Sequence, residues 1–142
     1  MAAGWSASAP LAGDLWSTHL AEQDLREREA AILRDEQRLR DLQAISNALE
    51  RYAELNGGFP ITGQIQSLCN YPADAGCGLT AVLSPLPTNP RGLPYWYQSD
   101  GQRFMLYAST EELPHNAECP SPLPSHLAAI PRLSCLSGQL ER

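Results

Sequence analysis

LQAISNALERYAELNGGFP, residues 42–60, is the stretch that decides the fold. Its large apolar residues recur at alternating three- and four-residue steps, which is the spacing of one face of an α-helix. Asn56-Gly57-Gly58 ends this helix, because glycine adopts the left-handed conformation of a C-cap at little cost. Phe59-Pro60 then begins an extended segment. We expect the rest of the chain to pack on the apolar face of the helix, which consists of Leu42, Ile45, Leu49 and Tyr52.

The helix should extend far toward the N-terminus. Asp14 is a suitable N-cap, and no proline or glycine lies between Asp14 and Leu55. We therefore predict a helix over residues 14–56, about 60 Å long, after a disordered or vector-derived lead of residues 1–13. A domain of this size is only about 30 Å across, so the N-terminal half of the helix should project from it or pair with another protein.

The projecting half carries a thin apolar seam. Leu25, Ile32 and Leu39 recur every seven residues, and we call these three residues the seam. A charged helix with such a seam is typical of a solvated helix or a short coiled coil. It is equally typical of a helix that packs against neighbouring subunits, so we predict the seam as a possible subunit contact. Pairs of acidic and basic residues four apart, which support an exposed helix, are Glu22/Arg26, Asp24/Arg28 and Glu36/Arg40.

After the helix, prolines recur through residues 57–94, which predicts a loop region. Residues 95–108, YWYQSDGQRFMLYA, predict an antiparallel hairpin with Asp100-Gly101 as its two-residue turn. That register places Ser99 opposite Gln102. The large side chains on one face of the hairpin, which we expect to form a core with the helix, are Tyr95, Tyr97, Phe104 and Leu106.

The C-terminal tail, residues 109–142, contains five prolines and shows little sign of regular structure. The chain has four cysteines at wide spacing, which fits two disulfides in an oxidising compartment. Four reduced, buried thiols are the alternative. Of the three possible pairings we favour Cys69–Cys77 and Cys119–Cys135, because each closes a short local loop.

Composition and motifs argue against catalysis. The chain has a net charge of −6 and no lysine, which disfavours nucleic-acid binding and excludes Schiff-base and phosphate-loop lysines. His19, His115 and His126 are scattered, without a nucleophile or carboxylate at a recognisable spacing. We predict no catalytic residue, no enzymatic activity and no cofactor. A calcium site with Asp74 and Asp100 in loops is a weaker hypothesis, because no calcium-loop motif is present.

The order of segments resembles the type IV pilin-like superfamily, which includes the type II secretion pseudopilins. The matching segments are DLQAISNALERYAELNGGFP and LSPLPTNPRGLPYWYQSDGQRFMLYASTEE, so the resemblance covers about half the chain, from Asp41 to Glu112. In this family the end of a long helix leads through a loop to a hairpin that packs across the helix. Cys119 and Cys135 are similar to the disulfide-bounded tail loop of many pilins.

The resemblance implies an α+β fold in a single domain, residues 14–142. It implies a structural subunit that assembles with other pilin-like subunits and assembly-machine proteins, in the periplasm or at the cell surface. The family's hydrophobic N-terminal helix, its inner-membrane anchor, does not occur in the sequence, and we expect it to precede the charged stretch. Asn89-Pro90-Arg91-Gly92 stands where major pseudopilins have a calcium-site loop, which favours a minor or atypical subunit. A binding or adhesion module that recognises a partner through its loops is the alternative.

Overall fold

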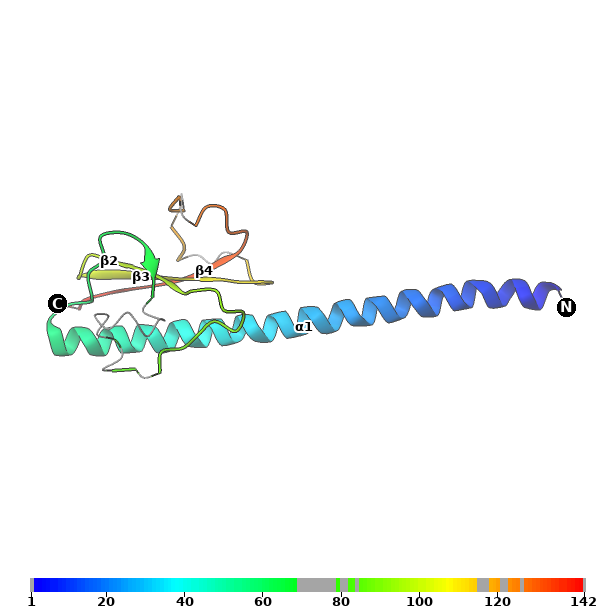
Figure 1. Ribbon diagram of the computed structural model, residues 1–142, viewed down its shortest axis with the longest axis horizontal. Helices are drawn as coiled ribbons and strands as arrows, with labels where there is room; N and C mark the ends of the chain where they lie inside the picture. Colours follow the sequence, from blue (N-terminus) through cyan, green and yellow to red (C-terminus); the bar gives the residue numbers. More distant parts are fainter. Residues whose placement is uncertain are drawn as a thin grey trace.

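A computed structural model shows a helix that is much longer than the rest of the molecule (Figure 1). The structure describes residues 2–68, 79, 82–83, 85–114, 118–120, 123–125 and 127–141, with residues 2–15 described by their backbone alone. Helix α1 spans Ala2–Asn56. The described part of residues 57–141 packs on the C-terminal half of α1, and we call it the cap.

The beginning of α1 differs from the prediction, whereas its end agrees with it. The predicted start at Asp14 was wrong, because residues 2–13 are helical rather than a disordered lead. This segment is rich in alanine, the strongest helix former, and the helix continues through Pro10. At the C-terminus Gly57 adopts a φ of 82° and donates its N–H to the carbonyl of Ala53 (2.8 Å), which ends the helix as predicted.

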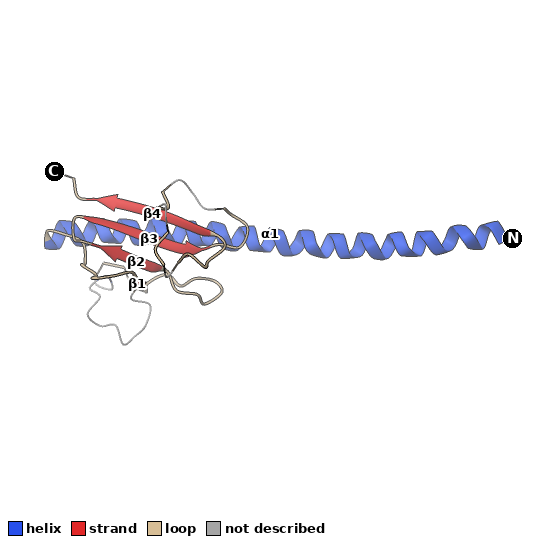
Figure 2. Ribbon diagram, turned by 90° about the horizontal axis from the view of Figure 1, so that it is seen from above, coloured by secondary structure: helices blue, strands red, loops and turns tan. Residues whose placement is uncertain are grey.

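Four strands form one antiparallel sheet with the order β1-β2-β3-β4. They are β1 (Gln66–Ser67), β2 (Trp96–Ser99), β3 (Arg103–Ser109) and β4 (Leu133–Gln139). Figure 2 shows the sheet lying along the C-terminal half of α1, with the N-terminal half extending beyond it. The α+β class is therefore confirmed, with one long N-terminal helix and a small antiparallel sheet.

The hairpin of β2 and β3 has a longer turn than predicted. Ser99 pairs with Phe104 rather than lying opposite Gln102, so the register differs from the prediction by two residues. The carboxylate of Asp100 accepts the backbone N–H groups of Gln102 and Arg103 at 2.9 Å each, which stabilises the wider turn. Because the displacement is an even number of residues, every side chain keeps its predicted face.

Two strands fall in segments that were predicted to lack regular structure. β1 lies in the predicted loop region, and β4 lies in the tail, where it pairs with β3 along its whole length. The sequence did not indicate β4 because this strand contains serines and a glycine, which carry little strand preference. Gly138 of β4 is required by packing, because a Cβ at this position would lie 2.3 Å from Cε2 of Phe104.

The core lies between α1 and the sheet. All the predicted helix and hairpin residues lie in or against one buried cluster, with Tyr52 at its partly buried margin. The buried members from the prediction are Leu42, Ile45, Leu49, Tyr95, Tyr97, Phe104 and Leu106. A second, smaller cluster covers part of the opposite face of the sheet and contains Tyr107, Leu127, Leu133 and Cys135.

Candidate functional site

Helix α1 carries an exposed apolar seam that begins beyond the cap and continues along the side of the helix that the cap leaves uncovered. Leu25, Ile32 and Leu39 of the seam are 56%, 41% and 39% exposed. Figure 1 shows α1 continuing well beyond the cap. Isolated exposed apolar residues are normal, but three at heptad spacing share one face of the helix, which is the pattern that pairs with another helix. The seam is therefore a candidate site of interaction.

The point where α1 leaves the cap is fixed by a buried carboxylate. Asp35 is fully buried, and its two oxygens accept the backbone N–H groups of Glu111, Glu112 and Leu113 at 2.8–3.0 Å. These three residues follow strand β3, so one side chain of the helix binds the loop at the end of the sheet. Arg38 donates to the same carboxylate at 2.8 Å. Asp35 thereby has four donors and no unpaired charge.

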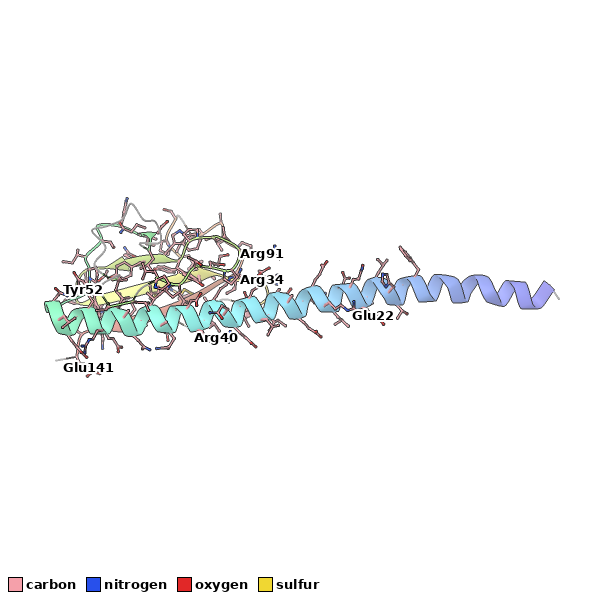
Figure 3. The ribbon with its side chains drawn as sticks, turned by 60° about the horizontal axis from the view of Figure 1, so that its bottom comes forward. Glu22, Arg34, Arg40, Tyr52, Arg91 and Glu141 are labelled. Atoms are coloured by element: carbon pink, nitrogen blue, oxygen red, sulfur yellow. A yellow bond between two sulfur atoms is a disulfide. The ribbon has the colours of Figure 1, made fainter. Side chains whose placement is uncertain are left out.

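Arg38 and Arg34 extend this contact into a network. Arg38 is 1% exposed and binds Glu111 Oε2 at 2.7 Å and Asn89 Oδ1 at 2.9 Å, in addition to Asp35. Arg34 binds both oxygens of Glu111 at 2.7 and 2.8 Å, which is the paired geometry of the strongest charge-assisted hydrogen bonds. We call Arg34, Asp35, Arg38, Asn89 and Glu111 the junction cluster. Figure 3 shows Arg34 near Arg91 at the edge of the cap.

The hydrogen bonds of the junction cluster keep its carboxylates ionised. The hydrogen bonds from Arg34 and then Arg38 lower the pKa of Glu111 to about 2, against the opposing effect of burial. Burial alone would raise the pKa of Asp35, but the backbone N–H groups of residues 111–113 and the guanidinium of Arg38 lower it below its usual value. The cluster is therefore charged throughout the neutral and mildly acidic range.

A second polar contact lies one turn further along α1. Tyr95 of the cap donates its hydroxyl to Asp41 Oδ2 at 2.5 Å, and Gln37 donates to the other oxygen at 2.7 Å. Burial, together with the neighbouring carboxylate of Asp41, raises the pKa of Tyr95 far above its usual value. Within the described residues, Asn89 Nδ2 is a buried polar atom without a hydrogen-bond partner. The helix is thus tied to the cap by polar groups as well as by the core.

The prediction from sequence missed the junction cluster. Asp35 and Arg38 lie in a run of charged residues, and such a run is typical of a solvated helix surface. A signal was nevertheless present, because Ala31, Asp35 and Arg38 continue the buried face of Leu42 at three- and four-residue steps. The predicted ion pairs of the exposed helix do not appear among the ion pairs of the described residues, and Arg40 instead donates to Gln37 Oε1 at 2.9 Å.

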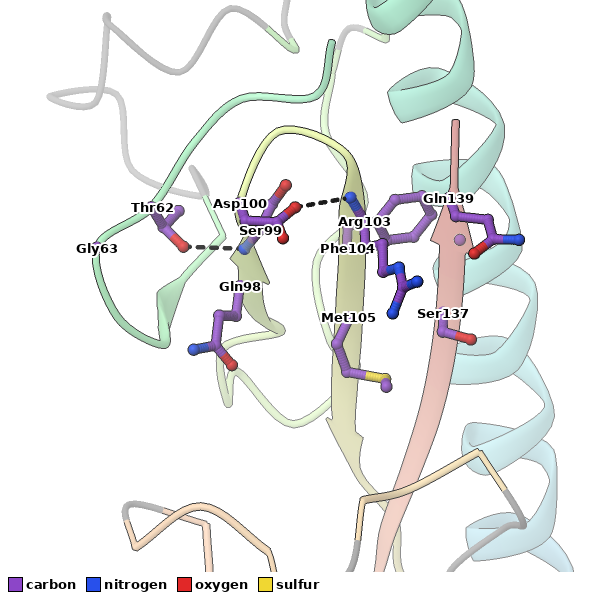
Figure 4. A pocket seen from close by; sticks show the side chains of 11 residues that line it. Thr62, Gly63, Gln98, Ser99, Asp100, Arg103, Phe104, Met105, Ser137 and Gln139 are labelled. Carbon is purple, nitrogen blue, oxygen red and sulfur yellow. Dashed lines mark hydrogen bonds between the residues drawn. The ribbon is translucent and has the colours of Figure 1, made fainter. Parts of the chain in front are cut away.

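An open groove lies beside the hairpin on the sheet (Figure 4). Asp100 is engaged in the turn, and Thr62 Oγ1 accepts the backbone N–H of Ser99 at 3.1 Å. The described lining contains no histidine or cysteine. The lining residues are Thr62, Gly63, Gln98, Ser99, Asp100, Arg103, Phe104, Met105, Ser137, Gly138 and Gln139.

The remaining predicted site residues are dispersed. Cys119 and Cys135 form the predicted disulfide, with a Cα–Cα distance of 5.0 Å. It links the segment around Cys119 to strand β4, which contains Cys135. His19 lies on the exposed part of α1, where its ring is 6.0 Å from that of Trp16. The other predicted positions, which lie outside the described residues, are Cys69, Cys77, Asp74, His115 and His126.

Two further findings concern binding and relatives. In the described part of the chain, no group of three or more metal-ligating side chains is placed to hold an ion, and no helix is sufficiently long and apolar to cross a membrane. Comparisons of the chain with protein-family models, curated proteins and solved structures found no match.

Proposed function

We propose that this chain is a structural pilin-like subunit, a pseudopilin or minor pilin, of a type II secretion pseudopilus or a type IV pilus. The observation that supports it most is the exposed seam of α1, which runs from the part that projects beyond the cap to the side of the helix that the cap leaves uncovered. An apolar seam on a projecting helix is suited to helix–helix packing, which is how a filament of such subunits is held together. The work of the protein is assembly, without chemical turnover.

The junction cluster supports the same role. Packing between subunits can position the cap only if the cap has a fixed place on its own helix. Asp35 binds three consecutive backbone N–H groups, which fixes the end of β3 against one turn of α1. In this role the cap lies in the periplasm or at the cell surface, and the subunit is held in the inner membrane before assembly.

The seam can be tested with two neighbouring residues of α1. Ile32→Asp places a charge in the seam, whereas Leu33→Asp places the same charge on an adjacent residue outside it. Both side chains are exposed, so neither change should unfold the cap. We expect Ile32→Asp to remove the full-length protein from filaments sheared from the cell, as measured by immunoblot and immunogold labelling, and Leu33→Asp to retain it.

Two results would count against the filament role. The first is that the wild-type protein is absent from sheared filaments under conditions in which the assembly system is active. Alternatively, Ile32→Asp and Leu33→Asp would be incorporated equally well, which would mean that the seam makes no contact in the assembly.

A further inference from the structure

Strand β4 forms one border of the sheet, so one of its edges faces away from β3 (Figure 2). Arg132 and Leu140, which flank β4, bond to the β3 side through a carbonyl and an N–H respectively. In an antiparallel ladder, residues that bond to the neighbouring strand alternate with residues whose N–H and C=O point away from it. The odd-numbered residues of β4, among them Ser137 and Gln139, therefore direct their backbone groups to the outer edge.

The strand itself lacks the features that normally prevent edge strands of different molecules from pairing. The sequence of β4 is LSCLSGQ, which contains neither a charged residue nor a proline, and all seven residues pair with β3. Natural edge strands are usually blunted by lysine, proline, a bulge or a very short length. Strand β1, at the other border of the sheet, is only two residues long. Any protection of β4 therefore comes from outside the strand.

Residues 118 and 119 supply that protection, because they lie along the outer edge of β4. Glu118 Oε2 accepts the outward N–H of Ser137 at 2.7 Å and its hydroxyl at 3.2 Å. Cys119 is disulfide-bonded to Cys135, and its Sγ lies 3.4 Å from the carbonyl oxygen of Leu133. These contacts fall on residues 133, 135 and 137 in turn, so the segment follows the strand. We call Glu118 and Cys119 the guard.

We propose that the outer edge of β4 is a pairing surface for the same edge of a second copy of the chain, and that the guard closes it. Two β4 strands pair antiparallel about a two-fold axis at Ser137 when Cys135 of each lies opposite Gln139 of the other. These residues are all odd-numbered, so outward N–H groups meet outward carbonyls. A second copy suits this edge because no charged side chain of β4 then meets a like charge.

The guard opposes this pairing at its centre. The N–H of Ser137, which lies on the two-fold axis, already donates to Glu118. Two guarded copies would also bring their Glu118 carboxylates together, which is unfavourable. Removing the guard frees the central N–H and removes this repulsion. The surface lies on the cap and does not involve the seam, so it is independent of the proposed filament role.

A full-length variant without the guard, Glu118→Ala/Cys119→Ser/Cys135→Ser, tests the proposal. We expect sedimentation velocity to show dimers of this unguarded variant at concentrations about tenfold or more below those at which the wild-type chain associates. An unguarded variant that associates no more readily than wild type would overturn the proposal.

Gln139→Pro identifies the surface that pairs. Proline removes the outward N–H, and β3 loses no hydrogen bond because that N–H points away from it. Added to the unguarded variant, Gln139→Pro should restore the monomer, whereas Gln139→Thr, which keeps the N–H, should retain the dimer. Association caused by partial unfolding would persist with Gln139→Pro, and a dimer that Ile32→Asp abolishes would place the contact at the seam. Either result would overturn the proposal.

Hydrogen exchange tests the guard in the monomer, without the triple variant. The N–H of Ser137 should exchange about tenfold or more faster in Glu118→Ala than in wild type, because its acceptor is lost. Glu141→Ala removes an exposed carboxylate beyond the end of β4 and should leave this rate unchanged. Equal exchange of Ser137 in Glu118→Ala and wild type would show that Glu118 does not close the edge, and would overturn the proposal.

Discussion

The two sides of α1 at the edge of the cap reverse the usual distribution of residues. Asp35 and Arg38 are 0% and 1% exposed, whereas Ile32 and Leu39, which lie within four residues of them, are 41% and 39% exposed. Charges are buried here because the cap supplies a hydrogen-bond partner for each of them. Apolar residues are exposed because no segment of the described chain covers them. Burial on this helix therefore depends on the partner that each face has, more than on the hydrophobicity of the residue.

On the buried side of α1, a substitution at Asp35 should lower the stability of the protein most. Asp35→Ala leaves three backbone N–H groups without their acceptor and removes one of the three acceptors of the Arg38 guanidinium. Removing one partner of a buried ion pair costs about 3–5 kcal/mol. We expect a loss of that size in the free energy of unfolding, measured by urea denaturation. Asp35→Asn retains one acceptor oxygen and should lose less; equal losses would show that an amide cannot replace the carboxylate at this position.

The apolar core of the same half should be nearly as sensitive. Leu49 is fully buried between α1 and the sheet. Leu49→Ala should lower the free energy of unfolding by about 2–5 kcal/mol, through lost transfer energy and the cavity that remains. Thermal and urea unfolding followed by circular dichroism would measure it. A near-neutral result would mean that the helix face does not pack on the sheet.

Acid should weaken the junction cluster by a smaller amount. The pKa of Glu111 is about 2 in the folded protein, below its ordinary value of 4.5, so its contribution is complete above pH 4.5 and is lost as pH falls toward 2. Glu111 is 30% exposed, so solvent screening limits this contribution to about 1–2 kcal/mol. Urea denaturation at a series of pH values should show a steeper loss of stability in wild type than in Glu111→Gln. Parallel curves would contradict this assignment.

A substitution on the exposed side of α1 should change the free energy of unfolding least. Ile32→Asp removes little buried area, so the free energy of unfolding should change by only about 0.5 kcal/mol or less. The same denaturation experiment as for Asp35→Ala measures it. A loss of several kcal/mol would mean that the seam is already covered in the isolated chain, and the distinction between the two sides would disappear.

The sequence was sufficient to predict the parts of the fold that follow from local periodicity. The three- and four-residue spacing of Leu42, Ile45 and Leu49 predicted the buried helix face, because that pattern depends only on helix geometry. The hairpin was predicted for a similar local reason. Its register was wrong because Asp100 stabilises a wider turn through its side chain, and the two-residue turn preferred by Asp-Gly did not account for that choice.

The features that depend on distant partners were not predicted. Strand β4 is stabilised by pairing with β3, and its serines and glycine carry little strand preference of their own. Asp35 is buried because residues 111–113, 76–78 positions away, present their N–H groups to it. Local sequence around Asp35 contains no information about that loop. The seam, by contrast, was noted from its heptad spacing alone; its residues are exposed, and its role as a subunit contact stays a prediction.

The position of Asp35 also determines how the molecule bears force. A pull along α1, applied through its projecting part, would load the cap as a shear that is greatest where the helix emerges. The three hydrogen bonds to Asp35 lie at that point, on the N-terminal side of the apolar core. Rupture should therefore begin at the junction, with the sheet remaining intact behind it. The buried carboxylate is therefore the contact of the cap that a pull along the helix would load first.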